Sequence, residues 1–161
     1  QLTAHIQAFD GTVIAGPRSG SKTADFAMNL SPPMTGINNT VSYVESLRPS
    51  VKIALQNGGH AINWIETTAG DDKVLESTLC GKAALIGTDK HQYLTVWPDQ
   101  EALISIFKKQ CFALQIEVQE LPQGLRIRDT KEHRFVFNYN REPIEYKGIT
   151  IKGAGVHWEA L

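Results

Sequence analysis

The chain has 161 residues, of which 42% are hydrophobic, and its 16 lysines and arginines nearly balance 17 aspartates and glutamates. This composition is typical of a globular protein of one or two domains, and the balanced charge argues against a dedicated nucleic-acid binder. No apolar run approaches the ~18 residues of a membrane helix, and a (β/α)8 barrel of about 250 residues cannot fit in the chain. We therefore expect neither a membrane nor a nucleic acid among the partners.

The two cysteines, Cys80 and Cys111, form neither a disulfide framework nor a metal-ligand spacing. This usage favours a reducing compartment, with reduced and mostly buried thiols. We expect a cytoplasmic protein without a bound metal or cofactor.

The first predicted element is a helix, because Leu2, Ile6 and Phe9 recur at helical spacing before Asp10-Gly11. A short buried strand is expected at 12–15. The chain opens inside the helix without an initiator Met, so we expect that a preceding part is absent.

Residues 16–39 are rich in Gly, Ser, Thr and Pro and predict a long loop, which compact domains seldom carry without a role in binding or packing. A helix is expected after the N-cap Asp99, with one apolar face formed by Leu103, Phe107, Cys111 and Leu114. The strands expected between the loop and this helix are 41–47, 61–67, 73–78, 83–86 and 93–97.

Leu121-Pro122-Gln123-Gly124 breaks the chain, and the following residues alternate between apolar and polar over 125–128, 134–139 and 144–152. A small antiparallel β unit fits this pattern. The predicted fold is therefore an α/β domain followed by a small all-β antiparallel domain, with a boundary near residue 120.

Residues 16–23, Gly-Pro-Arg-Ser-Gly-Ser-Lys-Thr, nearly match a phosphate-binding loop. That loop requires Gly directly before the Lys and a helix directly after it, whereas Ser21 precedes Lys22 and little room for a helix is left before Pro32-Pro33. The favoured interpretation is a loop whose Arg18, Lys22 and Asp25 tie it to neighbouring chain or to a partner subunit; a small nucleotide-binding α/β protein is the alternative.

A second candidate is nucleophilic chemistry by Cys80 with His157 and Glu159, whose spacing is similar to that of class I glutamine amidotransferases. Leu79-Cys80-Gly81-Lys82 lacks the two glycines of the tight nucleophile turn, so a small buried Cys80 is favoured. Glu45 and Glu66 are the one carboxylate pair considered for glycoside chemistry, although nothing in their spacing forces them together.

The chain resembles the C-terminal half of glycoside hydrolase family 42 β-galactosidases. The resemblance runs in order and spacing across nearly the whole chain. It is carried by residues 16–23 with Asp25-Phe26, Pro32-Pro33, 44–49 (Val-Glu-Ser-Leu-Arg-Pro), 64–66 (Trp-Ile-Glu), 93–99 (Tyr-Leu-Thr-Val-Trp-Pro-Asp), 121–126 (Leu-Pro-Gln-Gly-Leu-Arg) and 137–139 (Phe-Asn-Tyr).

The resemblance implies that residues 1–119 are the last portion of a glutamine-amidotransferase-like, flavodoxin-like domain that mediates trimerisation, and that 120–161 are a small antiparallel β domain. It also implies that both catalytic glutamates lie on a missing N-terminal barrel, so this chain should not hydrolyse galactosides alone and the substrate should bind only to the intact, homotrimeric enzyme. The candidates for assembly, or for lining the funnel of the active site, are Arg18, Ser19, Lys22, Asp25, Phe26, Glu45, Arg48, Trp64 and Glu66.

Overall fold

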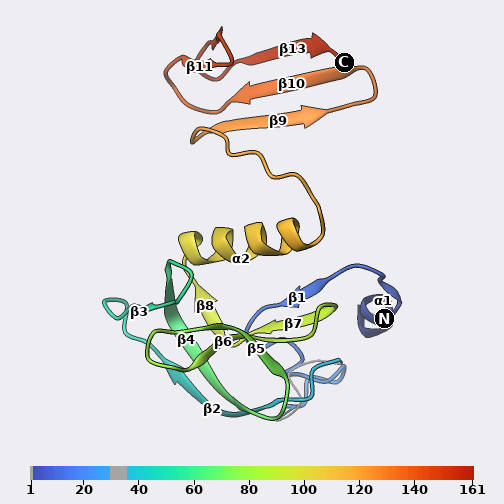
Figure 1. Cartoon of the computed structure of the whole chain (residues 1–161), viewed down its shortest axis with the longest axis vertical. Helices are drawn as coiled ribbons and strands as arrows, with labels where there is room; N and C mark the ends of the chain where they lie inside the picture. The colour runs from blue at the N-terminus through green and yellow to red at the C-terminus, as the bar shows by residue number, and fades with distance from the viewer. Residues whose placement is uncertain (1, 30–35) are drawn as a thin grey trace. The chain divides into compact units, whose positions relative to one another are not determined.

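A computed structural model describes residues 2–29 and 36–161, which divide into two compact units, Gln1–Gln115 and Ile116–Leu161 (Figure 1). The elements of the first unit are α1 (Leu2–Ala8), β1 (Val13–Ala15), β2 (Thr40–Ser46), β3 (Ile53–Ala54), β4 (His60–Ala69), β5 (Lys73–Ser77), β6 (Ala83–Gly87), β7 (His91–Leu94), β8 (Val96–Pro98) and α2 (Gln100–Ala113). Those of the second unit are β9 (Leu125–Asp129), β10 (His133–Asn138), β11 (Ile144–Tyr146), β12 (Ile149–Ile151) and β13 (Val156–Ala160).

Two sheets form the first unit. One has the order β1-β7-β6-β5, in which β1 runs parallel to β7 and the other pairs are antiparallel. The other has the order β2-β4-β3, with β8 also pairing with β4. Buried residues of β4, β6, β7 and β8 belong to one hydrophobic cluster, so the two sheets share a core.

The strand expected at 93–97 is two strands, because the chain changes sheets at Thr95. Tyr93 pairs with Ala15 in the first sheet, whereas Val96 pairs with Ile65 in the second. The fully buried Thr95 donates its hydroxyl to the Ala83 carbonyl at 2.6 Å, which satisfies the polar side chain at the crossing.

The helix α2 begins where the sequence predicts, with the Asp99 side chain accepting from the Ala102 amide at 2.9 Å. The expected core face is wrong. The buried residues are Ala102 and Ile106, whereas Leu103, Phe107 and Leu114 are exposed. The helix therefore packs Ala102 and Ile106 on the sheet, and Leu103, Phe107 and Leu114 lie on its exposed side.

The second unit has a three-stranded antiparallel sheet, β13-β10-β9, and a separate hairpin, β11-β12. Leu125, Val136 and Ile151 form its core, with Ile144 and Ile149 packed against them. The strand expected over 144–152 is this hairpin, which turns at Lys147-Gly148, both with positive φ. The final strand β13 was not assigned from the sequence.

Strand is the main regular structure of the described residues, beside helices of 7 and 14 residues. The small antiparallel β part of the predicted fold is present, while the amidotransferase-like α/β architecture of the first part stays a prediction. In the described part of the chain, no helix is long and apolar enough to cross a membrane.

Candidate functional site

The loop that follows β1 is held by a polar cluster in which Glu66 and Tyr93 are buried, Trp64 is half-buried and Arg18 is exposed. Glu66 is 3% exposed and its carboxylate accepts three hydrogen bonds: from the Tyr93 hydroxyl at 2.6 Å, the Trp64 indole at 2.9 Å and the Arg18 amide at 3.1 Å. The Tyr93 hydroxyl also accepts from the Arg18 amide at 2.9 Å. We call these four residues the anchor cluster.

The anchor cluster forms because of the crossing at Thr95. The Glu66 amide donates to the Thr95 carbonyl at 2.7 Å, which sets β4 beside the end of β7. Trp64 and Glu66 are two residues apart on β4 and therefore point to the same side. Tyr93 reaches them from β7, and the loop after β1 enters from β7's parallel neighbour.

Burial raises the pKa of the Tyr93 hydroxyl far above its usual value, and its hydrogen bond to Glu66 raises it further. Tyr93 therefore remains a proton donor at every physiological pH. Glu66 is satisfied by neutral donors, and the Arg18 guanidinium instead lies 5.3 Å from the centre of the Trp64 ring. Arg18 adopts a positive φ of 67°, which is uncommon for a residue other than glycine.

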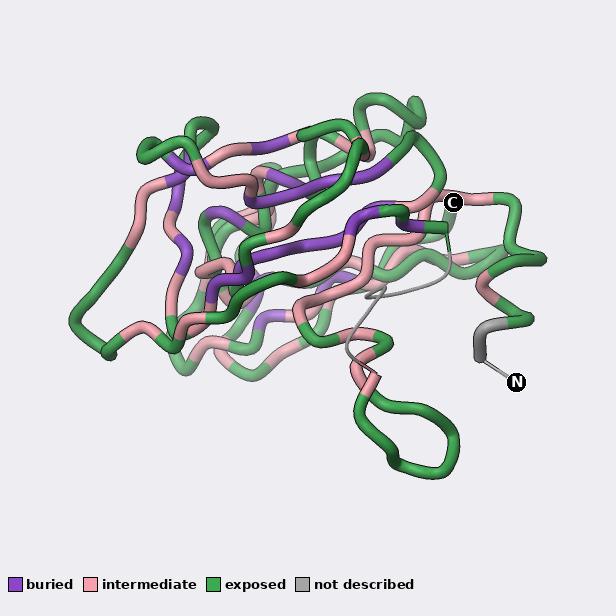
Figure 2. Tube along the Cα trace, turned by 90° about the horizontal axis from the view of Figure 1, so that it is seen from below, coloured by how far each residue is buried: buried purple, intermediate pink, exposed green. Residues whose placement is uncertain are grey.

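Beyond the anchor cluster, residues 19–29 extend as a loop of mostly exposed residues that stands away from the body of the first unit (Figure 2). A bridge between Lys22 and Met28 closes it, and Asp25 accepts from the Thr23 hydroxyl, which lowers the pKa of its carboxyl. Phe26 is 80% exposed and Met28 66%. We call residues 19–29 the projecting loop.

The projecting loop does not have the geometry of a phosphate-binding loop. Residues 21–29 contain a bridge and a turn and do not begin a helix, so the amides of a helix N-terminus are not available after Lys22. Pro32-Pro33 lies outside the described residues.

The structure does not bring the other predicted residues together. Glu45 pairs with the Lys82 ammonium, and it lies opposite Ile65 in the register of β2 and β4, whereas Glu66 lies opposite Val44. Glu45 and Glu66 therefore lie on opposite faces of the sheet and do not form a pair of facing carboxylates. Arg48 is exposed at the turn after β2, and Ser19 is half-buried beside the anchor cluster.

Cys80 is exposed, contrary to the expectation of a buried thiol, because it occupies a turn between β5 and β6. A hydrogen bond with the Thr78 hydroxyl, at 3.2 Å, is the main cause of its lowered pKa. His157 and Glu159 belong to the second unit. Cys111 is partly exposed.

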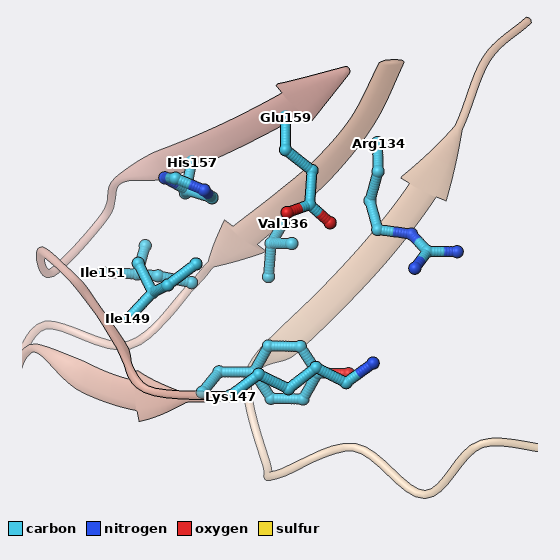
Figure 3. Close-up of a pocket in the computed structure, with 8 residues that line it drawn as sticks. Arg134, Val136, Lys147, Ile149, Ile151, His157 and Glu159 are labelled. Carbon is cyan, nitrogen blue, oxygen red and sulfur yellow. The ribbon is translucent and has the colours of Figure 1, made fainter. Parts of the chain in front are cut away.

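A small pocket lies in the second unit between β10, β13 and the β11-β12 hairpin (Figure 3). Val136, Ile149 and Ile151 form an apolar floor. The Arg134 guanidinium on its rim is engaged by Asp129 in two hydrogen bonds, at 2.7 and 2.8 Å. Glu159 is the one carboxylate among the lining residues, so the pocket lacks the pair of carboxylates that glycoside hydrolysis requires.

Tyr93 is the residue of the anchor cluster that sequence reasoning did not single out. In the sequence, Tyr93 is one apolar residue of the strand expected at 93–97. A buried tyrosine usually finds a partner for its hydroxyl, so the signal was present but did not identify Glu66 as that partner.

Comparison with known proteins finds relatives in sequence and in structure. The chain is 32% identical over 150 residues to a β-galactosidase of Thermus thermophilus, a match that takes in 87% of the chain and 23% of that enzyme. The crystal structure of the β-galactosidase from the psychrophilic Marinomonas ef1 matches 98% of the chain with a TM-score of 0.86 and 25% identity. The resemblance to β-galactosidases is confirmed.

The same fold occurs in a family 42 β-galactosidase from G. stearothermophilus, with a TM-score of 0.69 over 97% of the chain and 12% identity. No family model matches the chain. The chain spans about a quarter of the length of these β-galactosidases, with 23% of the Thermus thermophilus enzyme and 26 and 29% of the two solved chains covered.

Proposed function

We propose that the chain is the C-terminal part of a family 42 β-galactosidase, in which it serves subunit assembly and supports the active-site funnel rather than catalysis. The observation that carries the proposal is the projecting loop, whose base is fixed by a buried carboxylate while its apolar tip, Phe26 and Met28, lies in solvent. Exposed apolar residues on a fixed base are typical of a contact surface.

Two further features support a missing preceding part. The strand β1 is at the edge of its sheet and runs parallel to β7, and parallel pairs usually belong to larger α/β sheets that are covered on both faces. The outward face of α2 carries Leu103, Phe107 and Leu114. An amidotransferase-like domain completed by the missing chain would cover both.

Hydrolysis of terminal β-galactosides with retention would then depend on the missing barrel, since two carboxylates must lie about 5–5.5 Å apart in a retaining enzyme. Glu45 and Glu66 lie on opposite faces of their sheet. This arrangement favours a chain that is inactive alone. The cytoplasmic location proposed for the parent enzyme rests on the cysteine usage, and its homotrimeric state rests on the resemblance to family 42.

The first test is hydrolysis of a chromogenic β-galactoside by the purified chain, for which we expect the rate of a buffer blank. The second is the mass of the chain by light scattering over a range of concentrations. We expect self-association that Phe26→Ser weakens, with Tyr43→Ser as the control because Tyr43 is also exposed but lies on β2. Hydrolysis above the blank, or a mass that Phe26→Ser leaves unchanged, would refute the proposal.

A further inference from the structure

The sheet of the second unit carries a row of aromatic side chains on the face opposite its core. Val136 and Asn138 of β10 face the core, so the intervening residues His133, Phe135 and Phe137 face the other way. Tyr139 continues the row, and Trp158 of β13 lies opposite Phe135 in the register. We call these five residues the aromatic strip.

The rings of the aromatic strip are regularly spaced; Tyr139 and Trp158 are exposed, and the other three are half-buried. The centres of Phe135 and Phe137 are 6.3 Å apart and those of Phe137 and Tyr139 are 6.2 Å apart, with planes inclined by only 23° and 27°. The Trp158 ring lies edge-on to His133, with ring centres 5.2 Å apart. Tyr139 is 71% exposed and Trp158 59%.

Positive charge borders the aromatic strip on one side. In the register of β9 and β10, Arg126 lies opposite Phe137 and Arg128 opposite Phe135, so both arginines share the face of the strip. The strand carboxylates Asp129 and Glu159 lie opposite Arg134, on the core face. This face therefore has two arginines and no carboxylate from its strands, and no described interaction engages the Arg128 guanidinium.

We propose that the aromatic strip binds an acidic polysaccharide, a chain of sugar units that bears carboxylates. The C–H bonds of a pyranose ring form an apolar surface with a partial positive charge, which is attracted to the negative face of an aromatic ring. Successive sugar units of an extended chain would lie along the row, while their carboxylates meet Arg126 and Arg128 as charge-assisted hydrogen bonds. This site is independent of the assembly role proposed above.

The charge of the unit favours a glycan over a nucleic acid, which stacks on similar platforms. Residues 116–161 contain seven lysines and arginines and seven aspartates and glutamates, so the unit lacks the basic excess that a phosphate backbone requires. Two arginines beside four aromatic rings and a histidine suit a ligand of lower charge density, in which stacking supplies most of the contact.

The test uses the whole 161-residue chain and isothermal titration calorimetry with oligogalacturonate as the probe. Neutral β-1,4-galactan oligomers and oligothymidylate serve as comparators for charge and for class of ligand. Tyr139→Ala and Trp158→Ala change exposed rings, so both variants should remain folded by circular dichroism. Phe112→Ala is the matched control, since Phe112 is 87% exposed on α2 of the other unit.

We expect oligogalacturonate to bind more tightly than neutral galactan, and each strip variant to raise its Kd about tenfold. Arg128→Gln should weaken binding of oligogalacturonate alone and reduce its dependence on salt, whereas Arg141→Gln, an exposed arginine outside the sheet, should change neither. Absence of glycan binding, or strip variants that bind as tightly as Phe112→Ala, would overturn the proposal. Tighter binding of oligothymidylate would also overturn it, as would equal affinity for charged and neutral glycans.

Discussion

Replacing Tyr93 by Phe removes one hydroxyl from the anchor cluster and leaves the ring that fills the core. The lost bond, 2.6 Å long, is to a buried carboxylate, and hydrogen bonds to charged groups contribute about 1.5–3 kcal/mol each. Glu66 keeps its bonds from Trp64 and Arg18. We therefore expect Tyr93→Phe to lower the free energy of unfolding by about 2 kcal/mol.

Denaturant titration measures this loss as a lower midpoint at an unchanged slope, which shows that the surface exposed on unfolding is the same. Tyr43→Phe is the control, because Tyr43 is 61% exposed on β2, and it should change stability by less than about 0.5 kcal/mol. Trypsin should also cleave after Arg18 faster in Tyr93→Phe, since the amide of Arg18 loses one of its two acceptors.

The pH dependence of the stability of Tyr93→Phe tests whether the loss comes from the buried Tyr93 hydroxyl. Burial raises the pKa of Tyr93 in the folded chain, so above about pH 10 the unfolded chain releases this proton while the folded chain keeps it. The wild type then loses up to about 1.4 kcal/mol of stability per pH unit from this group, a loss that Tyr93→Phe lacks. The difference between the two proteins should shrink as pH rises. A difference that stays constant, or that is absent at neutral pH, would refute the anchoring role.

Three further substitutions test other parts of the fold. Asp99→Ala removes the N-cap of α2 and should cost about 1 kcal/mol at neutral pH. Partial burial raises the pKa of Asp99, but hydrogen bonds from Ala102 and His60 lower it overall. The cost should therefore decline as pH falls below about 4, because the wild type then loses the charged cap as well; a cost independent of pH would contradict the capping role. Asn138→Ala removes a buried amide that donates to the carbonyls of Glu142, Ile151 and Lys152, and calorimetry should show a loss of about 2–3 kcal/mol; an unchanged melting profile would count against it. Gly59 has a φ of 70°, and an added Cβ would lie 2.2 Å from the Ala102 amide nitrogen, so we expect Gly59→Ala to lower the denaturation midpoint. A midpoint as high as that of the wild type would contradict the close approach of this turn to α2.

Local patterns in the sequence predict much of this fold. The N-cap at Asp99 and the strands expected at 61–67 and 83–86 depend on neighbouring residues, and each of these elements forms close to its expected place. The division of 93–97 was not predictable from alternation, because Tyr93 to Trp97 reads as one uninterrupted strand and only pairing with β1 and β4 separates its halves. The prediction for the buried face of α2 was wrong for a related reason: apolar residues recur on more than one face of the helix, and only its packing on the sheet decides that Ala102 and Ile106 are buried.

The site is predictable to a lesser degree. Composition and the broken phosphate-loop motif favour a loop at 16–23, and the structure has a loop there. Its observed attachment is the Arg18 backbone amide, whereas Asp25 and Lys22 pair within the loop. The sequence does not predict the contacts of Arg18 with Glu66 and Tyr93, which lie 48 and 75 positions further along the chain. Such contacts depend on which strands become neighbours in the fold. The resemblance to β-galactosidases depends on order and spacing across the chain, and no single residue carries it.

The anchor cluster holds the projecting loop through the backbone amide of Arg18, and the side chain takes no part in the bonds to Glu66 and Tyr93. Every amino acid except proline supplies that amide, and glycine or asparagine would tolerate the positive φ with less strain. The loop can consequently change its chemistry during evolution without losing its point of attachment. Related proteins can in this way present different side chains on the projecting loop while the loop keeps the same attachment.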